Sequence, residues 1–235
     1  MAEHSMVAGV TEMPLTWSVV IPVKVLARAK SRLAGLAGPA RSELALAMAA
    51  DTVRAAAACP AVAAVVVVTD DPAAATTLGA LGARVVADEP DAGLNPALTH
   101  GAAVAVAARP DCGTAALAAD LPALRPAELG RGLQAAAQWP EAFVADAEGS
   151  GTTLYAVRPG AAFRPRYGPG SAARYRDGGA AEIVLADVPS LRCDVDTPAD
   201  LQNAIGLGVG PRTAELAAQI RCGRLAADRV RRLTG

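Results

Sequence analysis

A continuous apolar run of strand length, VAAVVVVT at residues 62–69, is the feature that most limits the folds open to this chain. A strand that is apolar at successive positions is buried on both faces, as strands are in a parallel sheet covered by helices. A second apolar run, Val19–Val23, comes before it, and a stretch compatible with a helix lies between the two. The pattern therefore predicts a β-α-β arrangement at the start of an α/β domain.

The alternation of strand and helix continues as far as residue 138. Asp71-Pro72 and Asn95-Pro96 each combine a capping side chain with a proline, which is typical of a helix start. We expect strands at 17–23, 62–69, 83–87 and 114–119, and helices at 38–58, from 71, at 95–108 and at 126–138. This order predicts a doubly wound, mostly parallel twisted sheet flanked by helices.

The second half of the chain is less regular. Strand-like runs recur at 142–145, 152–157, 182–188 and 191–195, and a segment rich in Gly, Pro and Arg occupies 158–179. A helix is expected from Thr197-Pro198, and the tail from Pro211 has a helical pattern. With no repeat and no clear linker, we expect a disordered lead at 1–15, one domain at 16–206 and a helical extension at 207–235.

Composition narrows the class of protein. The net charge of −1 argues against a general nucleic-acid binder, which normally carries a basic excess. No apolar run approaches the roughly 20 residues of a membrane span, and the N-terminus lacks the basic and apolar regions of a signal peptide. The four cysteines form no CxxC pair, which favours reduced thiols over a zinc site. We expect a cytoplasmic protein with neither a nucleic acid nor a membrane as partner.

Cationic side chains follow the first strand directly. Lys24, Lys30 and Arg32 come after Val19–Val23, and the carboxyl end of a strand is where ligands bind in open α/β sheets. Two lysines and an arginine at that place suit a nucleoside triphosphate. The segment lacks the glycines of a Walker A loop, and a solvated basic helix start is an equally good interpretation of the residues alone.

Acidic side chains follow two later strands. Asp120 comes directly after the strand at 114–119, and Asp194 and Asp196 are two positions apart, so that on a strand they would share one face. Mg²⁺ is bound by one or two carboxylates together with phosphate oxygens and water. Asp120 could equally cap the next turn, and Asp196 could shape the turn before Thr197. Together with the lysines, however, the two acidic clusters favour a metal–phosphate site.

A third cluster suits a small anionic substrate. Gly151–Leu154 offers backbone and hydroxyl groups, and Gly168–Ser171 leads into a possible helix start among arginines, although a solvated surface loop would look similar. The only histidines, His4 and His100, have no partners that suggest a triad. Phosphoryl and nucleotidyl transfer need no such base, since they depend on positioning and charge stabilisation.

These segments together resemble the CofC/FbiD family, the guanylyltransferases of coenzyme F420 biosynthesis. The resemblance runs from about residue 17 to about residue 204. It is carried by IPVKVLARAKSRL (21–33), VVVTDD (66–71), DAGLNPAL (91–98), AADLPAL (118–124), GTTLYAV (151–157), YGPGSAARY (167–175) and CDVDTPADL (193–201). It implies a single-domain, Rossmann-like nucleotidyltransferase of the GT-A type.

The resemblance also implies a reaction, in which GMP is transferred from GTP to phosphoenolpyruvate, giving enolpyruvoyl-2-diphospho-5′-guanosine and diphosphate. By motif, Thr153, Gly168 and Ser171 match the family's phosphoenolpyruvate contacts. Lys24 and Lys30 match its nucleotide-phosphate end, and Asn95 lies in its nucleotide-side loop. Asp120 and one or both of Asp194 and Asp196 match the ligands of Mg²⁺.

Several alternatives stay open. The acid could be 2-phospho-L-lactate, which differs by one sp² carbon. A molybdenum-cofactor nucleotidyltransferase shares the fold type but has a glycine-rich loop after the first strand that this chain lacks. A non-catalytic GTP-binding module would need no acidic pair. A homodimer, and an F420-pathway transferase that receives the product, are the protein partners to consider.

Overall fold

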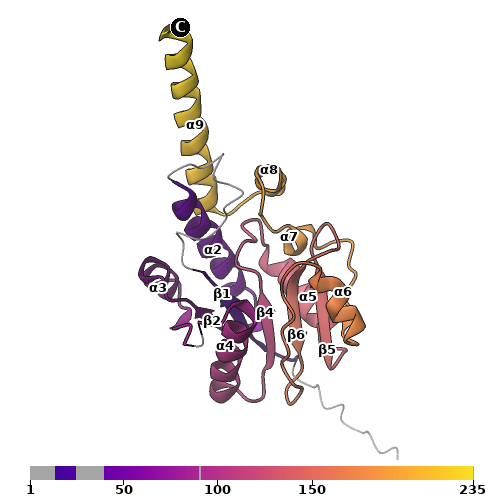
Figure 1. Cartoon of the computed structure of the whole chain (residues 1–235). Helices are drawn as coiled ribbons and strands as arrows, with labels where there is room; N and C mark the ends of the chain where they lie inside the picture. The colour runs from indigo at the N-terminus through magenta and orange to yellow at the C-terminus, as the bar shows by residue number, and fades with distance from the viewer. Residues whose placement is uncertain (1–13, 25–39, 90, 235) are drawn as a thin grey trace, which may run out of the picture.

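The computed structural model describes residues 14–24, 40–89 and 91–234, with side chains as far as Gly223. Within these ranges seven strands form one sheet, in the order β3-β2-β1-β4-β6-β5-β7. Helices lie on both of its faces (Figure 1). The strands are β1 (Trp17–Pro22), β2 (Val62–Val68), β3 (Arg84–Val86), β4 (Gly113–Leu117), β5 (Glu141–Ala145), β6 (Thr152–Val157) and β7 (Ala181–Glu182).

The sheet is mostly parallel, as the sequence predicts. β1 pairs in parallel with β2 and β4, and β2 pairs in parallel with β3. β6 is the exception, because it runs antiparallel to both β4 and β5. As a result β6 begins at the edge where β1, β4 and β5 end, and that edge collects residues from four strands.

The helices cover the two faces in separate groups. α2 (Arg41–Ala57), α3 (Pro72–Gly79), α5 (Pro126–Ala136) and α7 (Pro189–Arg192) contribute buried side chains to one cluster. α4 (Leu94–Ala108) and α6 (Ser171–Asp177) contribute to the cluster on the opposite face. A third, smaller cluster lies where α2 meets α8 (Pro198–Leu207) and α9 (Pro211–Thr234), and α9 extends away from the sheet (Figure 1).

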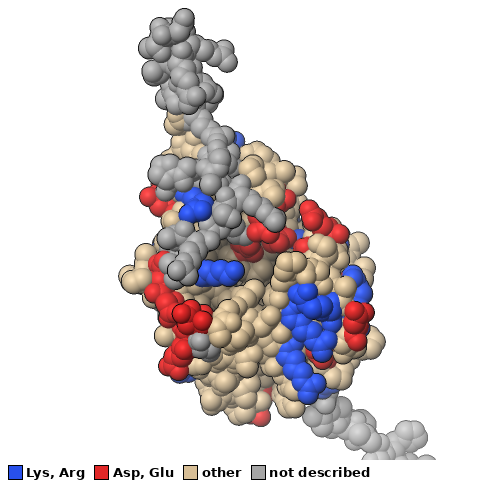
Figure 2. Space-filling model, viewed as in Figure 1, with Lys and Arg blue, Asp and Glu red and all other residues tan. Residues whose placement is uncertain are grey.

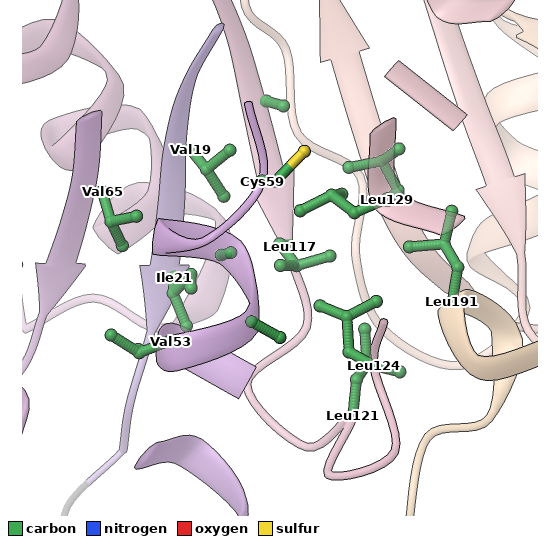
Figure 3. Close-up of a cluster of buried hydrophobic side chains, with 14 of the residues drawn as sticks. Val19, Ile21, Val53, Cys59, Val65, Leu117, Leu121, Leu124, Leu129 and Leu191 are labelled. Carbon is green, nitrogen blue, oxygen red and sulfur yellow. The ribbon is translucent and has the colours of Figure 1, made fainter. Parts of the chain in front are cut away.

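The alternation of side chains along β1 explains why both faces must be covered. Val19 and Ile21 point into the first cluster, and Val20 between them points into the second. Figure 3 shows Val19 and Ile21 beside Leu117 of β4 and Val53 of α2. Since successive side chains of a strand alternate between faces, an all-apolar strand can only be stable between two layers of helices.

A glycine lets α4 approach the sheet closely. A Cβ atom at Gly101 would lie 2.6 Å from side-chain carbons of both Val20 and Val68, which is closer than carbon atoms pack. The close contact sets the height of α4 above β1 and β2, and so the position of its first turn at the carboxyl edge of the sheet.

Some details differ from the expectations. Residues 191–195 contain the end of α7 and an irregular segment rather than a strand. Of the strand expected at 182–188, only Glu182 belongs to a strand, as the last residue of β7. Asn95 is the second residue of α4 rather than its cap, which is Gly93. The predicted helix start at 38–39 lies outside the described residues, within which α2 begins at Arg41. The domain boundaries stay a prediction.

A buried carboxylate of α2 accepts hydrogen bonds from the first turn of the C-terminal helix. Asp51 of α2 accepts hydrogen bonds from the backbone N–H groups of Thr213 (2.7 Å) and Arg212 (3.3 Å) in the first turn of α9. A carboxylate at a helix start satisfies N–H groups that have no partner within the helix. Along the described part of the chain, none of the helices combines the length and apolar character that crossing a membrane requires.

Candidate active site

A cavity of about 750 Å³ opens at the carboxyl edge of the sheet. It is lined by Lys24 after β1, Asp120 after β4, Asp146 after β5 and Thr152 at the start of β6. Figure 2 shows acidic groups gathered at the edge of a hollow near the centre of this face. Ligands of open α/β sheets bind at this edge, and the volume is that of a small-molecule site.

Asp120 is held by a buried threonine of α2. The Thr52 hydroxyl accepts a hydrogen bond from the Leu121 N–H (3.1 Å) and lies within bonding distance of the Met48 (2.9 Å) and Ala119 (3.2 Å) carbonyl oxygens. Because Ala119 and Leu121 flank Asp120, the threonine fixes the turn that carries the carboxylate. The turn follows β4 by two residues, so the Asp120 side chain reaches the cavity.

The second acidic segment is joined to the first by a backbone hydrogen bond. The Val195 N–H donates to the Asp120 carbonyl oxygen at 3.0 Å, and Asp194 and Asp196 on either side of Val195 both line the cavity. The two clusters thus converge as predicted, although the segment is not the strand that was expected. The start of α8 is capped by Thr197 together with Asp200 in a reciprocal pair of hydrogen bonds.

Asp146 is a cavity carboxylate that the sequence argument missed. It lies directly after β5, it is buried, and it accepts hydrogen bonds from the N–H groups of Ser150 (2.9 Å) and Gly151 (2.7 Å). These contacts close the loop that leads into β6. The signal that could have revealed it is a carboxylate after a short apolar strand, the same signal that pointed to Asp120.

The crowding of carboxylates perturbs Asp194. Burial, and then the charges of Asp120, Asp146 and Asp196, raise the pKa of Asp194 to about 7. Such a cluster is costly without cations, which is why acidic residues in a cleft mark candidate functional sites. A bound divalent cation would remove the repulsion.

The donor set suits Mg²⁺. Within the described ranges, no three or more His, Cys, Asp or Glu side chains are grouped so that they could hold a metal ion. The protein would therefore supply only one or two carboxylates, from Asp120 and from Asp194 or Asp196. This is the usual provision for Mg²⁺ in nucleotide sites, where phosphate oxygens and water complete the octahedron.

The opposite wall of the cavity carries hydroxyl and glycine residues. Gly168 and Ser171 line it, and the buried Ser171 hydroxyl donates to the Thr152 hydroxyl at 2.9 Å. Thr153 follows Thr152 in β6 but does not line the cavity, and its buried hydroxyl has no hydrogen-bond partner among the described residues. Its carbonyl oxygen accepts from the Ala118 N–H at 2.8 Å, which ties β6 to the end of β4.

The residues predicted to bind the nucleotide differ in whether they line the cavity. Lys24 is exposed and lines the cavity next to Val23. Lys30, with Arg32, lies outside the described residues. Asn95 does not line the cavity, although its neighbour Leu94 does, and its side-chain amide is bonded to the backbone of Tyr167.

Comparison with known proteins agrees with this geometry. The family described as "Guanylyl transferase CofC like" matches residues 17–226, which is most of the chain. The chain belongs to this family. Among its relatives is a protein of Thermomonospora curvata named phosphoenolpyruvate guanylyltransferase, 67% identical over 206 residues, covering 88% of this chain and 90% of the relative. A Streptomyces coelicolor protein of the same name is 60% identical over 207 residues, covering 88% and 98%.

Solved structures of low sequence identity share the fold of this chain. A putative nucleotide-diphospho-sugar transferase from Desulfovibrio desulfuricans G20 superposes with a TM-score of 0.62 at 16% identity, covering 87% of this chain and 97% of that one. CMP:2-keto-3-deoxy-manno-octonic acid synthetase, complexed with CTP, gives a TM-score of 0.52 at 20% identity, covering 82% and 98%. The predicted nucleotidyltransferase fold of this CofC-like chain is therefore confirmed.

Proposed function

We propose that this chain is a phosphoenolpyruvate guanylyltransferase. It transfers GMP from GTP to phosphoenolpyruvate and forms enolpyruvoyl-2-diphospho-5′-guanosine and diphosphate, as a step of coenzyme F420 biosynthesis. The observation that carries the proposal is the hydrogen bond from Val195 to Asp120, which joins two acidic segments in one cavity opposite Gly168 and Ser171. The names and the high identity of the relatives supply the substrates.

The reaction needs little acid–base chemistry from the protein. A phosphate oxygen of phosphoenolpyruvate, already an anion, attacks the α-phosphorus of GTP, and the bond from that phosphorus to the bridging oxygen of the diphosphate breaks. No proton has to be removed from the nucleophile. Consistent with this, no histidine is among the described residues that line the cavity.

Each of the predicted site residues is assigned one part of the reaction. Lys24, with Lys30, binds the diphosphate and stabilises the charge that develops on it as it leaves. Ser171, Gly168 and Thr153 hold the phosphorylated acid so that its phosphate oxygen faces the α-phosphorus. Mg²⁺, held by Asp120 and by Asp194 or Asp196, would supply neutralisation of charge on the nucleotide phosphates.

A crossed substrate assay tests the proposal. Diphosphate release is measured for GTP, ATP and CTP, each with phosphoenolpyruvate or 2-phospho-L-lactate, with Mg²⁺ and with the F420-pathway transferase added to consume the product. We expect release with GTP and phosphoenolpyruvate well above every other pair. A preference for 2-phospho-L-lactate would correct the acid, and GTP binding without release would indicate a non-catalytic module.

A further inference from the structure

The segment that carries Gly168 and Ser171 is attached to α4 by one side chain. The Asn95 amide donates from Nδ2 to the Tyr167 carbonyl oxygen (3.1 Å) and accepts at Oδ1 from the Tyr167 N–H (2.8 Å). The pair satisfies both backbone groups of Tyr167, 72 residues away in the chain. These bonds use one of the two Nδ2 donors and one acceptor site of Oδ1, and the Asn95 side chain does not line the cavity.

A second side chain fastens the same segment to α6. The Arg174 guanidinium donates from Nε (3.1 Å) and Nη2 (2.9 Å) to the Arg166 carbonyl oxygen, and from Nη1 to the Pro169 carbonyl oxygen. These carbonyls lie on either side of Gly168, whose φ of 125° is open mainly to glycine. A Cβ at Gly168 would lie 3.2 Å from Arg174 Nη2, so the guanidinium lies directly against the loop.

The segment is also connected to the strand that leads to the acidic residues. The Tyr167 hydroxyl donates to the Ala116 carbonyl oxygen of β4 at 3.1 Å. Burial, with further contributions from Tyr175 and Tyr155, raises the pKa of the Tyr167 phenol well above its usual range, so the hydroxyl keeps its proton. The loop is thus held from α4, from α6 and from β4.

From these contacts we infer that Asn95 and Arg174 are positioning residues for the acid substrate: they hold residues 166–171 in the shape that binds the phosphorylated acid. The inference rests on the proposed function and changes the predicted role of Asn95, which was expected on the nucleotide side. Neither side chain is among the described residues that line the cavity. Each acts through the backbone of the loop that presents Gly168 and Ser171.

The kinetic test compares the KM for phosphoenolpyruvate with the KM for GTP. Asn95→Ala and Arg174→Gln should each raise the KM for phosphoenolpyruvate about tenfold, the effect of losing roughly one to two hydrogen bonds of ordinary net strength. The KM for GTP should stay within about twofold. Thr99→Ala on the exposed face of α4 and Arg176→Gln on α6, where Arg176 pairs with Glu182, are matched controls that should leave both constants unchanged.

A second measurement does not depend on activity. Amide hydrogen exchange over residues 166–171 should be faster in Asn95→Ala than in Thr99→Ala, because the Tyr167 N–H loses its acceptor. If Asn95→Ala does not fold, Asn95→Asp replaces it: the acceptor for the N–H remains, while a carboxylate oxygen faces the Tyr167 carbonyl and should loosen the loop.

The outcomes are distinct. A rise in the KM for GTP that equals or exceeds the rise in the KM for phosphoenolpyruvate would overturn the inference. It would indicate that Asn95 acts in nucleotide binding, as the sequence predicted. Unchanged constants together with unchanged exchange would also overturn it. If the wild-type protein releases no diphosphate from GTP and phosphoenolpyruvate, the proposed function fails, and the exchange experiment still decides whether Asn95 holds the loop.

Discussion

Replacing Asp194 by Asn should stabilise the metal-free protein, and the gain should grow as the pH rises. Burial, and then the charges of Asp120, Asp146 and Asp196, raise the pKa of Asp194 to about 7 in the folded protein. In the unfolded chain an aspartate ionises near about 3.9. Between these two values the unfolded chain has released a proton that the folded protein still holds, so the free energy of unfolding falls as the pH rises.

The magnitude follows from the distance between the two pKa values. At about 1.4 kcal/mol for each pKa unit, the full penalty of ionising Asp194 above pH 7 has a ceiling of about 4 kcal/mol. Because the side chain is only partly buried and water screens its neighbours, we expect about 1–3 kcal/mol. Asp194→Asn removes this penalty, since an amide of nearly the same shape carries no charge.

The assay is urea unfolding of both proteins at about pH 4 and about pH 8.5 with a chelator present. The difference in free energy of unfolding between variant and wild type should be near zero at the lower pH and largest at the higher one. Asp111→Asn, an exposed carboxylate before the start of β4, is the matched control and should show no such trend. A difference that stays the same at both values would refute the electrostatic reasoning.

Three further predictions test neighbouring parts of the structure. Asp120→Asn should lower kcat about 10²–10³-fold or more with an unchanged circular dichroism spectrum, because it removes a charge that acts on the reacting phosphates; near-normal turnover would count against a metal role. Thr52→Val leaves the Leu121 N–H without its acceptor and should lower the free energy of unfolding in urea by about 1–3 kcal/mol, with a lower kcat because Asp120 shifts. Unchanged stability and kcat would mean that the Thr52 hydroxyl does not hold the turn. Asp51→Ala removes the acceptor for the first turn of α9 and should cost about 1–2 kcal/mol by thermal unfolding while turnover persists, and a loss of turnover would instead connect α9 to catalysis.

The sheet could be predicted from the sequence because its strands show local patterns of apolar residues. Val62–Val68 is apolar at successive positions and is flanked by turn residues, so its burial on both faces can be deduced without knowledge of its partners. The convergence of Asp120 with Asp194 and Asp196 followed from a similar argument, since residues at the ends of sheet segments meet at one edge. The predicted parallel arrangement is confirmed for β1, β2, β3 and β4.

The details that were missed depend on contacts between distant parts of the chain. Asp146 follows a strand of five residues with no flanking motif, and its place in the cavity results from the antiparallel course of β6. Residues 191–195 have strand-like composition, but their long-range backbone hydrogen bonds go to Asp120 and to Ala147, neither of which lies in a strand. Asn95-Pro96 has the pattern of a helix cap, and only the fold shows that Tyr167 lies within reach of its amide.

We propose that carboxylates from two separate segments hold one cation beside the nucleotide phosphates. Crystals grown with Mn²⁺ and a non-hydrolysable GTP analogue would test it through the anomalous difference map of manganese. We expect a peak in the cavity at about 2.0–2.3 Å from a carboxylate oxygen of Asp120 and from one of Asp194 or Asp196. A map in which the nucleotide is bound but the manganese peak lies away from Asp120, or contacts neither Asp194 nor Asp196, would contradict the account.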